Sequence, residues 1–411
     1  MGRGRYVAGI DVGSTKVCTV IADVSEGVGP RLLGYGWVPS LGIQRGAVVD
    51  LEEVGRSLAD AIDQAERSSG QKIDSAFFSI ADEHVSSFNR RGLVTVGAKP
   101  RAITQSHVTR AVESTTFALD LEPGQEVIHF VPRSFCVDHR YHVQNPVGMQ
   151  GNRLEVETHV ISGATTSIVN MMQAVHRHGL DIDEFVVSPL AAAEAVVTPE
   201  ERHAGVMLID IGGGTTDIAV FTDGGISFTG VVAMGGNQVT SDLAIGLRVP
   251  LSTAEQVKLQ TGRCTDTGMH GDETVVLPSF DGGVPENVPL VFVTEICQAR
   301  VEEILEAVMD RVAASGFAAP LPGGAVLTGG GALLPGIVEL ARRTLDLPIR
   351  LGVPTGIAGS QEVLKNPAMA VGAGLVLWGM HNGHPEQRGR VGTGLHGAKR
   401  RLGTWFRQMA L

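Results

Sequence analysis

The stretch Leu208-Ile-Asp-Ile-Gly-Gly-Gly-Thr-Thr-Asp-Ile-Ala-Val220 decides the fold of this protein. The apolar residues before its three glycines predict a buried strand, and those after them predict a second strand. Glycine has no Cβ to hold a ligand away, so successive N–H groups in such a turn can converge on an anion. Asp210 ends the first strand, where its carboxylate can face a hydrated Mg²⁺ ion on a phosphate. An ordinary hairpin can have a similar sequence, so one such turn does not distinguish a phosphate-binding turn from an ordinary hairpin.

A second copy of the pattern lies near the N-terminus. Gly9-Ile-Asp-Val-Gly-Ser-Thr-Lys-Val17 repeats the order of strand, Asp, Gly and hydroxyl residue, and a hairpin pattern follows each copy. A repeat on this scale predicts two related subdomains that face each other across a cleft. Their turns would hold a polyphosphate from both sides, although Lys16 could instead be solvated. The residues expected to bind phosphate are Gly13, Ser14, Thr15, Lys16, Gly212, Gly213, Gly214, Thr215 and Thr216.

A third glycine turn, Thr328-Gly-Gly-Gly-Ala332, follows a strand-like segment and is expected to open a helix with Pro335 in its first turn. Three such turns in this order resemble the phosphate and adenosine loops of the superfamily of actin, DnaK-type chaperones and sugar kinases. The resemblance implies a duplicated, actin-like (ribonuclease H-like) α/β fold that binds ATP, with Mg²⁺ held through water by Asp11 and Asp210. It implies an adenosine site formed by Gly236, Glu255, Lys258, Gly329, Gly330 and Gly331.

Two of these adenosine residues also have a simpler explanation. Ser252-Thr-Ala-Glu255 has the spacing of a capping box, which predicts that a helix starts there. Glu255 and Lys258 lie one turn apart on this helix and could form an ordinary ion pair. In the superfamily the matching acidic and basic residues contact the ribose and the adenine of the nucleotide. Both the ion pair and the nucleotide contact therefore remain open for this pair.

The composition narrows the classes of protein. A chain of 411 residues, 43% of them hydrophobic, is expected to form two or more domains. Its net charge of −11 argues against wholesale binding of nucleic acid. The four cysteines include no CxxC pair, which favours reduced structural cysteines over a metal site. Asp11 precedes any long apolar region, so no signal peptide is expected.

From His84 to about Gly163 the pattern changes to alternating segments around a helix that begins near Thr104, which predicts a small inserted α+β domain. In length and place it resembles the 1C domain of the bacterial cell-division family FtsA, and this resemblance covers residues 6–380. Actin and the DnaK-type chaperones carry a different insertion elsewhere. The expected segments are 1–83, 163–204 and 359–380 (subdomain IA), 84–162 (1C), 205–245 and 318–358 (IIA), 246–317 (IIB), 381–396 (flexible linker) and 397–411 (amphipathic helix).

The C-terminal segment has the pattern of a membrane-binding helix. Its apolar residues recur at i, i+3, i+4 and i+7, and basic residues flank them or lie opposite. Aromatic and aliphatic residues with a basic face suit an anionic membrane surface. A disordered tail or a helix that docks on the protein's own core are the alternatives. The residues expected to meet the membrane are Leu402, Trp405, Phe406, Met409, Lys399, Arg400, Arg401 and Arg407.

The resemblance to FtsA implies a function. It implies an ATP-binding protein that polymerises head to tail, anchors filaments of the tubulin-like protein FtsZ to the cytoplasmic membrane and recruits later division proteins through 1C. Such a protein lies peripherally on the cytoplasmic face of the membrane at the division site. The FtsZ contact is expected in residues 246–317, with Arg300 meeting the acidic FtsZ tail. The alternatives are a PilM-type pilus assembly protein, which shares the insert, and a small-molecule kinase, for which the sequence shows no catalytic base.

The hinge between the two halves bears on hydrolysis. The alanine-rich segment from Val186 to Ala195 resembles the helix that crosses this hinge in the superfamily. DnaK-type chaperones carry a Glu just before the proline of that helix, and actin uses a Gln nearby. Here Ser188 precedes Pro189, and serine is a poor base. We therefore expect at most a weak ATPase, with ATP acting as a ligand for conformation and polymerisation.

Overall fold

The computed structural model describes residues 5–25, 29–117, 119, 121–265, 273–278 and 286–382. Its first sheet has the strand order β13-β6-β1-β2-β3. β1 pairs antiparallel with β2 and parallel with β6, so the sheet combines a meander with a crossover. The strands are β1 (Tyr6–Val12), β2 (Lys16–Asp23), β3 (Arg31–Pro39), β6 (Ser75–Ile80) and β13 (Asp181–Val187).

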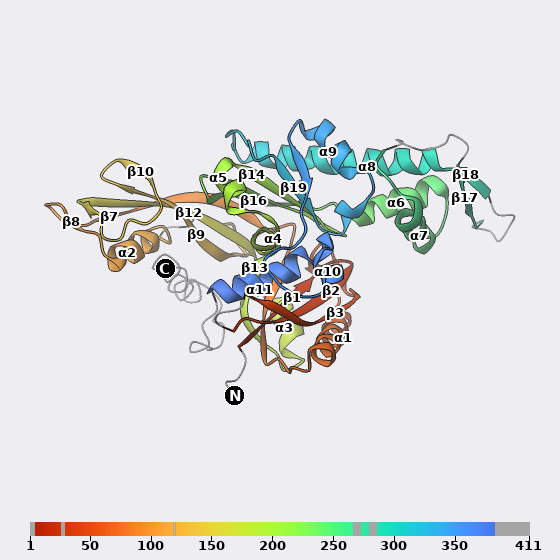
Figure 1. Ribbon diagram of the computed structural model, residues 1–411, viewed down its shortest axis with the longest axis horizontal. Coiled ribbons are helices and arrows are strands. Elements are labelled where there is room, and N and C mark those ends of the chain that lie inside the picture. The colour runs from red at the N-terminus through yellow and green to blue at the C-terminus, as the bar shows by residue number, and fades with distance from the viewer. Residues whose placement is uncertain are drawn as a thin grey trace.

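The second sheet repeats this arrangement in the order β16-β15-β14-β19-β20. β14 pairs antiparallel with β15 and parallel with β19, as β1 does with β2 and β6. The duplication predicted from the two glycine turns is therefore confirmed, as is the actin-like fold that the resemblance implies, and the sheets lie in separate halves of the molecule (Figure 1). The strands are β14 (Val206–Ile211), β15 (Thr216–Thr222), β16 (Gly225–Val232), β19 (Ala325–Thr328) and β20 (Ile349–Leu351).

A third sheet, with the order β10-β9-β12-β7, forms the inserted domain that projects from the body (Figure 1). Helix α2 (Gln105–Ser114) follows Thr104, as the sequence predicts, and packs on β7 and β12 around a small separate core. A two-stranded ribbon joins β8 (Arg101–Ala102) to β11 (Gln150–Gly151). The sheet strands are β7 (Ser86–Thr95), β9 (Gln125–Val137), β10 (Arg140–Val143) and β12 (Arg153–Ala164).

Helices cover the first two sheets, and their ends follow local sequence signals. Asp50 caps α1 (Leu51–Ser69) by accepting hydrogen bonds from the N–H groups of Glu52 and Glu53, and Gly70 ends it in a left-handed conformation. The remaining helices are α3 (Thr165–His176), α4 (Ser188–Val196), α5 (Pro199–Ala204), α6 (Gly236–Leu247), α7 (Leu251–Thr261), α8 (Leu290–Ala314), α9 (Ile337–Leu345), α10 (Gln361–Leu364) and α11 (Ala370–Asn382). Short elements are β4 (Ile43–Gln44), β5 (Ala47–Val48), β17 (Thr274–Leu277), β18 (Glu286–Pro289) and the 3₁₀ turns Gly331–Leu333 and Pro367–Met369.

The helix predicted at Ser252 is confirmed, but its predicted capping box is absent, and the predicted place of Pro335 in the first turn of a helix is wrong. α7 begins at Leu251 after Pro250, without a side-chain cap, because the Glu255 carboxylate bonds Thr240 and Lys258 instead of turning back to the helix start. Pro335 precedes α9, because the third glycine turn first forms a 3₁₀ turn and the α-helix starts only at Ile337. In α7, the contacts of Glu255 with Thr240 and Lys258 replace the capping interaction that the local sequence predicts.

Helix α4 crosses α11 at very close range, which its small residues permit. Every residue of α4 from Ser188 to Val196 except Glu194 is buried. A Cβ built on Gly374 of α11 would lie only 1.7 Å from the carbonyl oxygen of Ala191. The two helices join the halves, since α11 also packs on β1 and α4 on β14 and β15. The absence of a side chain at Gly374 therefore sets the spacing at the hinge.

We expect Gly374→Ala to destabilise the protein. Overpacking a tight core costs about 1–3 kcal/mol, occasionally more, and the roughly 1 kcal/mol that Ala gains over Gly in a helix offsets only part of it. Urea unfolding should show a lower midpoint. Gly372→Ala on the same helix is the control, because its nearest neighbour is a methyl group of Val20 at 3.0 Å. An equal or smaller loss for Gly374→Ala would contradict the prediction.

All four cysteines are free and buried, as expected for structural residues. Among the helices of the described residues, none combines the length and apolar character needed to span a bilayer. The predicted linker from residue 383 onwards and the predicted amphipathic helix, residues 397–411, lie outside the described residues.

Candidate functional site

The first two glycine turns have the same local geometry. In each, the N–H of the first glycine donates to the carbonyl that closes the hairpin, Gly13 to Lys16 and Gly212 to Thr215, both at 2.9 Å. The start of α6 packs on the second turn, since the N–H groups of Gly236 and Asn237 donate to the carbonyls of Gly212 and Gly213. The predicted phosphate residues are thereby held on rigid turns between strands.

The two turns face and touch each other. A Cβ on Gly213 would lie 1.8 Å from Thr15 Oγ1, and a Cβ on Gly214 would lie 2.6 Å from Ser14 Oγ. Ser14 Oγ also accepts a hydrogen bond of 3.1 Å from the N–H of Gly46. A side chain at either glycine would displace the hydroxyl-bearing side chain opposite it, Thr15 or Ser14. The repeat separated in sequence thus becomes one site with hydroxyl and N–H donors on both sides.

Asp11 and Lys16 form an ion pair within the first turn. Burial acts to lower the pKa of Lys16, but Asp11, Cys18 and Asp210 together outweigh it and the net pKa is raised. The solvated alternative for Lys16 is therefore wrong. Ser79 on β6 donates to Asp11 Oδ1 at 2.9 Å and accepts from the N–H of Val12. Asp11 is consequently fixed in position by a neighbouring strand.

Two more buried carboxyl groups lie on the second hairpin. Burial, with a further contribution from the Asp11 carboxylate, raises the pKa of Asp210 to about 7. Burial and the Asp210 carboxylate raise the pKa of Asp217 well above its ordinary value. Asp217 Oδ1 is buried without a hydrogen-bond partner in the described part of the chain. Sequence reasoning missed Asp217, although the hairpin register places it directly opposite Asp210.

These carboxyl groups fit a hydrated cation. Within the described ranges, no three His, Cys, Asp or Glu side chains lie closely enough together to hold a metal ion by themselves. Mg²⁺ keeps several of its waters and commonly shares its remaining contacts with phosphate oxygens. Buried acids at the ends of β1 and β14 beside two phosphate-type turns match that mode, and the unpartnered oxygen of Asp217 adds an acceptor.

The predicted adenosine residues of α6 and α7 form a connected group. Lys258 Nζ donates to the carbonyl of Gly236 at 3.0 Å and to Thr240 Oγ1 at 2.8 Å. It also forms an ion pair of 2.7 Å with Glu255. The ion pair expected from spacing is confirmed, and Thr240 is a further member that the spacing does not reveal. The Lys258 ammonium ties α7 to the glycine that follows the second turn.

The third glycine turn lies against the second. Gly329 has φ +84°, and a Cβ there would lie 2.2 Å from Asp210 Oδ1. A Cβ on Gly331 would lie 2.4 Å from Ile211 Cγ2. The Oγ1 of Thr328 donates to the carbonyl of Gly352 at 3.0 Å. All three predicted turns therefore meet around the end of β14.

Two other predicted residues are engaged elsewhere. Arg300 on α8 forms an ion pair with Asp242, with Nη2 at 3.1 Å from Oδ1, and a second one of 2.7 Å with Glu303. Its hydrogen bond to Asp242 is the main reason that the pKa of Arg300 is raised. Ser188 Oγ lies 3.4 Å from the carbonyl oxygen of Ile80. The eight predicted membrane residues all lie outside the described residues.

Two sheets of identical order, three glycine turns around paired acids and an inserted domain define an actin-like ATPase fold. PilM in the PilM–PilN type IV pilus biogenesis complex has the same fold, with a TM-score of 0.63 at 16% identity over 91% of this chain and 98% of that one. MreB5 of Spiroplasma citri bound to ADP gives a TM-score of 0.53 at 15% identity over 90% and 94% of the two chains.

Sequence comparison defines the family within this class. The chain is 35% identical to the cell division protein FtsA of Pseudomonas aeruginosa over 92% of its length and 90% of that protein. It is 32% identical to FtsA of Escherichia coli over 98% of both chains. Residues 207–374 match the family model "Cell division protein FtsA" and residues 82–162 match "SHS2 domain inserted in FTSA". The chain belongs to the FtsA family of cell division proteins.

Proposed function

We propose that this protein is an ATP-binding, actin-like cell-division protein that polymerises, anchors FtsZ filaments to the cytoplasmic membrane and recruits later division proteins. One observation carries the proposal: a chain related to FtsA proteins over almost its whole length also brings three glycine turns together around buried acids. The pilus-assembly alternative shares the fold, but the sequence relationship favours cell division. Among the residues that the structure describes, no feature of the site favours a small-molecule kinase.

ATP is proposed to bind between the two halves. The glycine N–H groups and hydroxyls of the first two turns would hold the phosphates, and Asp11 and Asp210 would hold Mg²⁺ through water, with Asp217 beside them. Glu255, Lys258 and the third turn would receive the adenosine. Structures of the fold neighbour MreB5 are described as bound to ADP and to AMPPNP, which supports the choice of an adenine nucleotide.

We expect hydrolysis to be slow. Ser188 lies against the carbonyl of Ile80 at the end of β6, and a serine there provides no base for water. A phosphate-release assay should give a turnover far below the typical enzyme median of about 10 s⁻¹. Ser188→Ala should leave that low rate unchanged, since no base is removed. A turnover above the median, or its loss in Ser188→Ala, would contradict this prediction.

The FtsZ contact is proposed on residues 246–317, which contain α7 and α8. Large apolar side chains are exposed there, among them Leu251, Leu259 and Phe292. Arg300 lies in the same subdomain, but its charge is already matched by Asp242 and Glu303. An acidic FtsZ tail would therefore have to displace Asp242 from Arg300, so the apolar side chains should contribute the larger share of the binding energy.

The decisive experiment is co-sedimentation with liposomes that contain anionic lipid, with and without ATP and FtsZ. The proposal predicts that the protein sediments with these vesicles, more completely with ATP, and that FtsZ enters the pellet only when the protein is present. Vesicles of neutral phosphatidylcholine are the control. If FtsZ stays in the supernatant under every condition, the tethering function is wrong.

A further inference from the structure

The hairpin of β15 and β16 connects the phosphate site with the inserted domain. β15 starts at Thr216, directly after the second glycine turn, and β16 leads back through Gly235 to α6 beside the same turn. β16 is the edge strand of the second sheet. Its outer backbone groups therefore lack a strand partner in that sheet, and edge groups of this kind need other partners.

Side chains of β7 in the inserted sheet supply those partners. Ser87 Oγ donates to the carbonyl of Thr229 at 2.6 Å and accepts a hydrogen bond of 3.0 Å from the N–H of the same residue. Asn89 Nδ2 donates to the carbonyl of Ser227 at 3.0 Å. One edge of the second sheet is thus covered by side chains that belong to a different domain.

A buried histidine completes the contact. His159 on β12 places Nδ1 at 2.8 Å from Asn89 Oδ1 and Nε2 at 3.0 Å from Thr229 Oγ1. Burial, with an added contribution from Arg133, lowers the pKa of His159 to about 3, so the ring is neutral at physiological pH. Because Asn89 already uses its amide nitrogen toward Ser227, its oxygen accepts from Nδ1–H and Nε2 accepts from the Thr229 hydroxyl. A single imidazole therefore bridges the two domains.

The far end of the hairpin is held in the same way. Arg133 Nη2 on β9 donates to Thr222 Oγ1 at 2.7 Å. A Cβ on Gly225 would lie 2.7 Å from Arg133 Cγ, so the close approach requires glycine. Gln144 Nε2 donates to the carbonyl of Asp223 at 3.2 Å. Contacts therefore extend along the outer edge of β16 and around the turn at its start.

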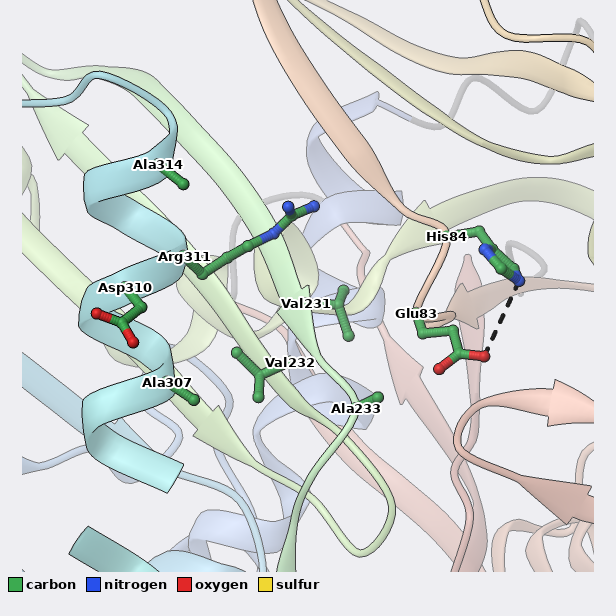
Figure 2. A pocket seen from close by; sticks show the side chains of 9 residues that line it. All are labelled: Glu83, His84, Val231, Val232, Ala233, Ala307, Asp310, Arg311 and Ala314. Carbon is green, nitrogen blue, oxygen red and sulfur yellow. Dashed lines mark ion pairs between the residues drawn. The ribbon is translucent and has the colours of Figure 1, made fainter. Parts of the chain in front are cut away.

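The inserted domain is also tied covalently to the first half. It enters after β6, the strand whose Ser79 holds Asp11 in place, and returns through β12 into α3. The entering segment, with Glu83 and His84, faces the last residues of β16 and the Arg311 side of α8 across a groove (Figure 2). One domain therefore spans from the strand beside the first phosphate turn to the hairpin that bears the second.

We propose that the inserted domain is a latch that holds the two halves of the nucleotide cleft together, and that its release from β16 sets the rate of nucleotide exchange. The latch rests on the hydrogen bonds described, whereas its effect on exchange also rests on the proposed binding of ATP. The two glycine turns can separate to release a nucleotide only if the hairpin moves relative to β6. That movement breaks the bonds of Ser87, Asn89, His159 and Arg133 unless the inserted domain moves with the hairpin.

The test compares Ser87→Ala/Asn89→Ala with wild type and with Ser114→Ala. Ser114 Oγ accepts a hydrogen bond of 2.9 Å from the N–H of Leu93 inside the inserted domain, so its loss affects that domain without touching the second sheet. Melting temperatures should confirm that all three proteins are folded. Hydrogen exchange of the Thr229 amide, measured without nucleotide, reports how often the inserted domain separates from β16. The dissociation rate of a fluorescent ATP analogue reports how fast the cleft releases nucleotide.

The double variant should show faster exchange at Thr229 and about tenfold faster dissociation of the analogue, since each lost hydrogen bond contributes a few-fold. Ser114→Ala should match wild type in both. Faster amide exchange with unchanged dissociation would overturn the proposed control of nucleotide release, and unchanged amide exchange would overturn the latch itself. If wild type binds no nucleotide, the proposed function and the effect on exchange both fail, while amide exchange still decides on the latch.

Discussion

Asp210→Ala is expected to weaken binding of Mg²⁺–ATP by roughly ten- to a hundredfold, the loss typical of groups that hold a metal through an intermediate. Asp210 is buried at the end of β14, beside Asp11 and close against the third glycine turn. Removal of its carboxylate takes away one of the two acids proposed to orient the hydrated cation on the phosphates. Isothermal calorimetry with Mg²⁺ and a non-hydrolysable ATP analogue measures the affinity.

The variant should remain folded, because a buried acid whose pKa is raised contributes no stability in its charged form. The raised pKa means that the folded protein binds the proton more tightly than the unfolded chain does. Stability from this group is therefore highest below pH 4 and falls as the pH rises toward 7. Asp63→Ala, at an exposed position of α1, is the control for loss of one negative charge. If Asp210→Ala binds Mg²⁺–ATP like wild type, the metal assignment is wrong.

The Asp210 carboxyl group also predicts how the affinity for Mg²⁺–ATP depends on pH. With a pKa of about 7 in the free protein, Asp210 is largely protonated at pH 6 and must release its proton before it can face Mg²⁺. Affinity should therefore rise about tenfold between pH 6 and pH 8. ATP titrates in this range too, so the difference between wild type and Asp210→Asn isolates the protein's contribution. An identical pH profile for the two proteins would contradict this explanation.

Trp405→Glu is expected to release the protein from anionic liposomes. In the predicted amphipathic helix, transfer of the Trp405 side chain from water into the membrane contributes roughly 1.5–3 kcal/mol or more, and a glutamate in its place would be repelled by anionic lipid. A helix of about fifteen residues is marginal in water, so folding should accompany membrane binding and a monomer should bind weakly. A filament that presents many tails gains avidity, and one disrupted residue per tail should therefore have a large effect.

Co-sedimentation with ATP measures the release, and Trp405→Phe is the matched control because it keeps an aromatic residue on the apolar face. Nucleotide affinity should be unchanged in both variants, since the predicted linker separates the tail from the cleft. Wild-type sedimentation of Trp405→Glu would show that residues 397–411 are not the anchor. The membrane function would then have to reside elsewhere in the chain.

Features encoded within a few consecutive residues could be predicted from the sequence. Asp50 marks the start of α1, Thr104 marks the start of α2, and the apolar runs around the first two glycine turns mark paired strands. The alanines of α4 indicate that close helix packing is possible for the same reason, since the small size of a residue is visible in isolation. Each signal acts through the backbone of its own segment or through a residue's own volume.

Contacts between distant segments could not be predicted in this way. Glu255 abandons the capping box because Thr240 on another helix offers its hydroxyl, and Arg300 pairs with Asp242 across two helices. Asp217 looks like an ordinary strand residue until the hairpin register sets it opposite Asp210. In each case the packing of the elements determines which partner is near. A buried polar group then forms its hydrogen bond with that partner, because an unpaired buried polar group is costly.

The sequence by itself determined the repeated strand–turn–strand pattern, the third glycine turn and the inserted domain, because hydrophobic periodicity and glycine's lack of a side chain act locally. The actin-like fold was implied by the resemblance of these three turns to a known superfamily. Only the tertiary structure decided that the turns touch and that Asp217 lies beside the predicted acids Asp11 and Asp210. It also decided that His159 joins the inserted domain to β16. Those arrangements depend on the distances between residues that are far apart in the chain and on how deeply each residue is buried. Burial then shifts the pKa values of Asp210, Asp217 and His159, a property that no single segment carries.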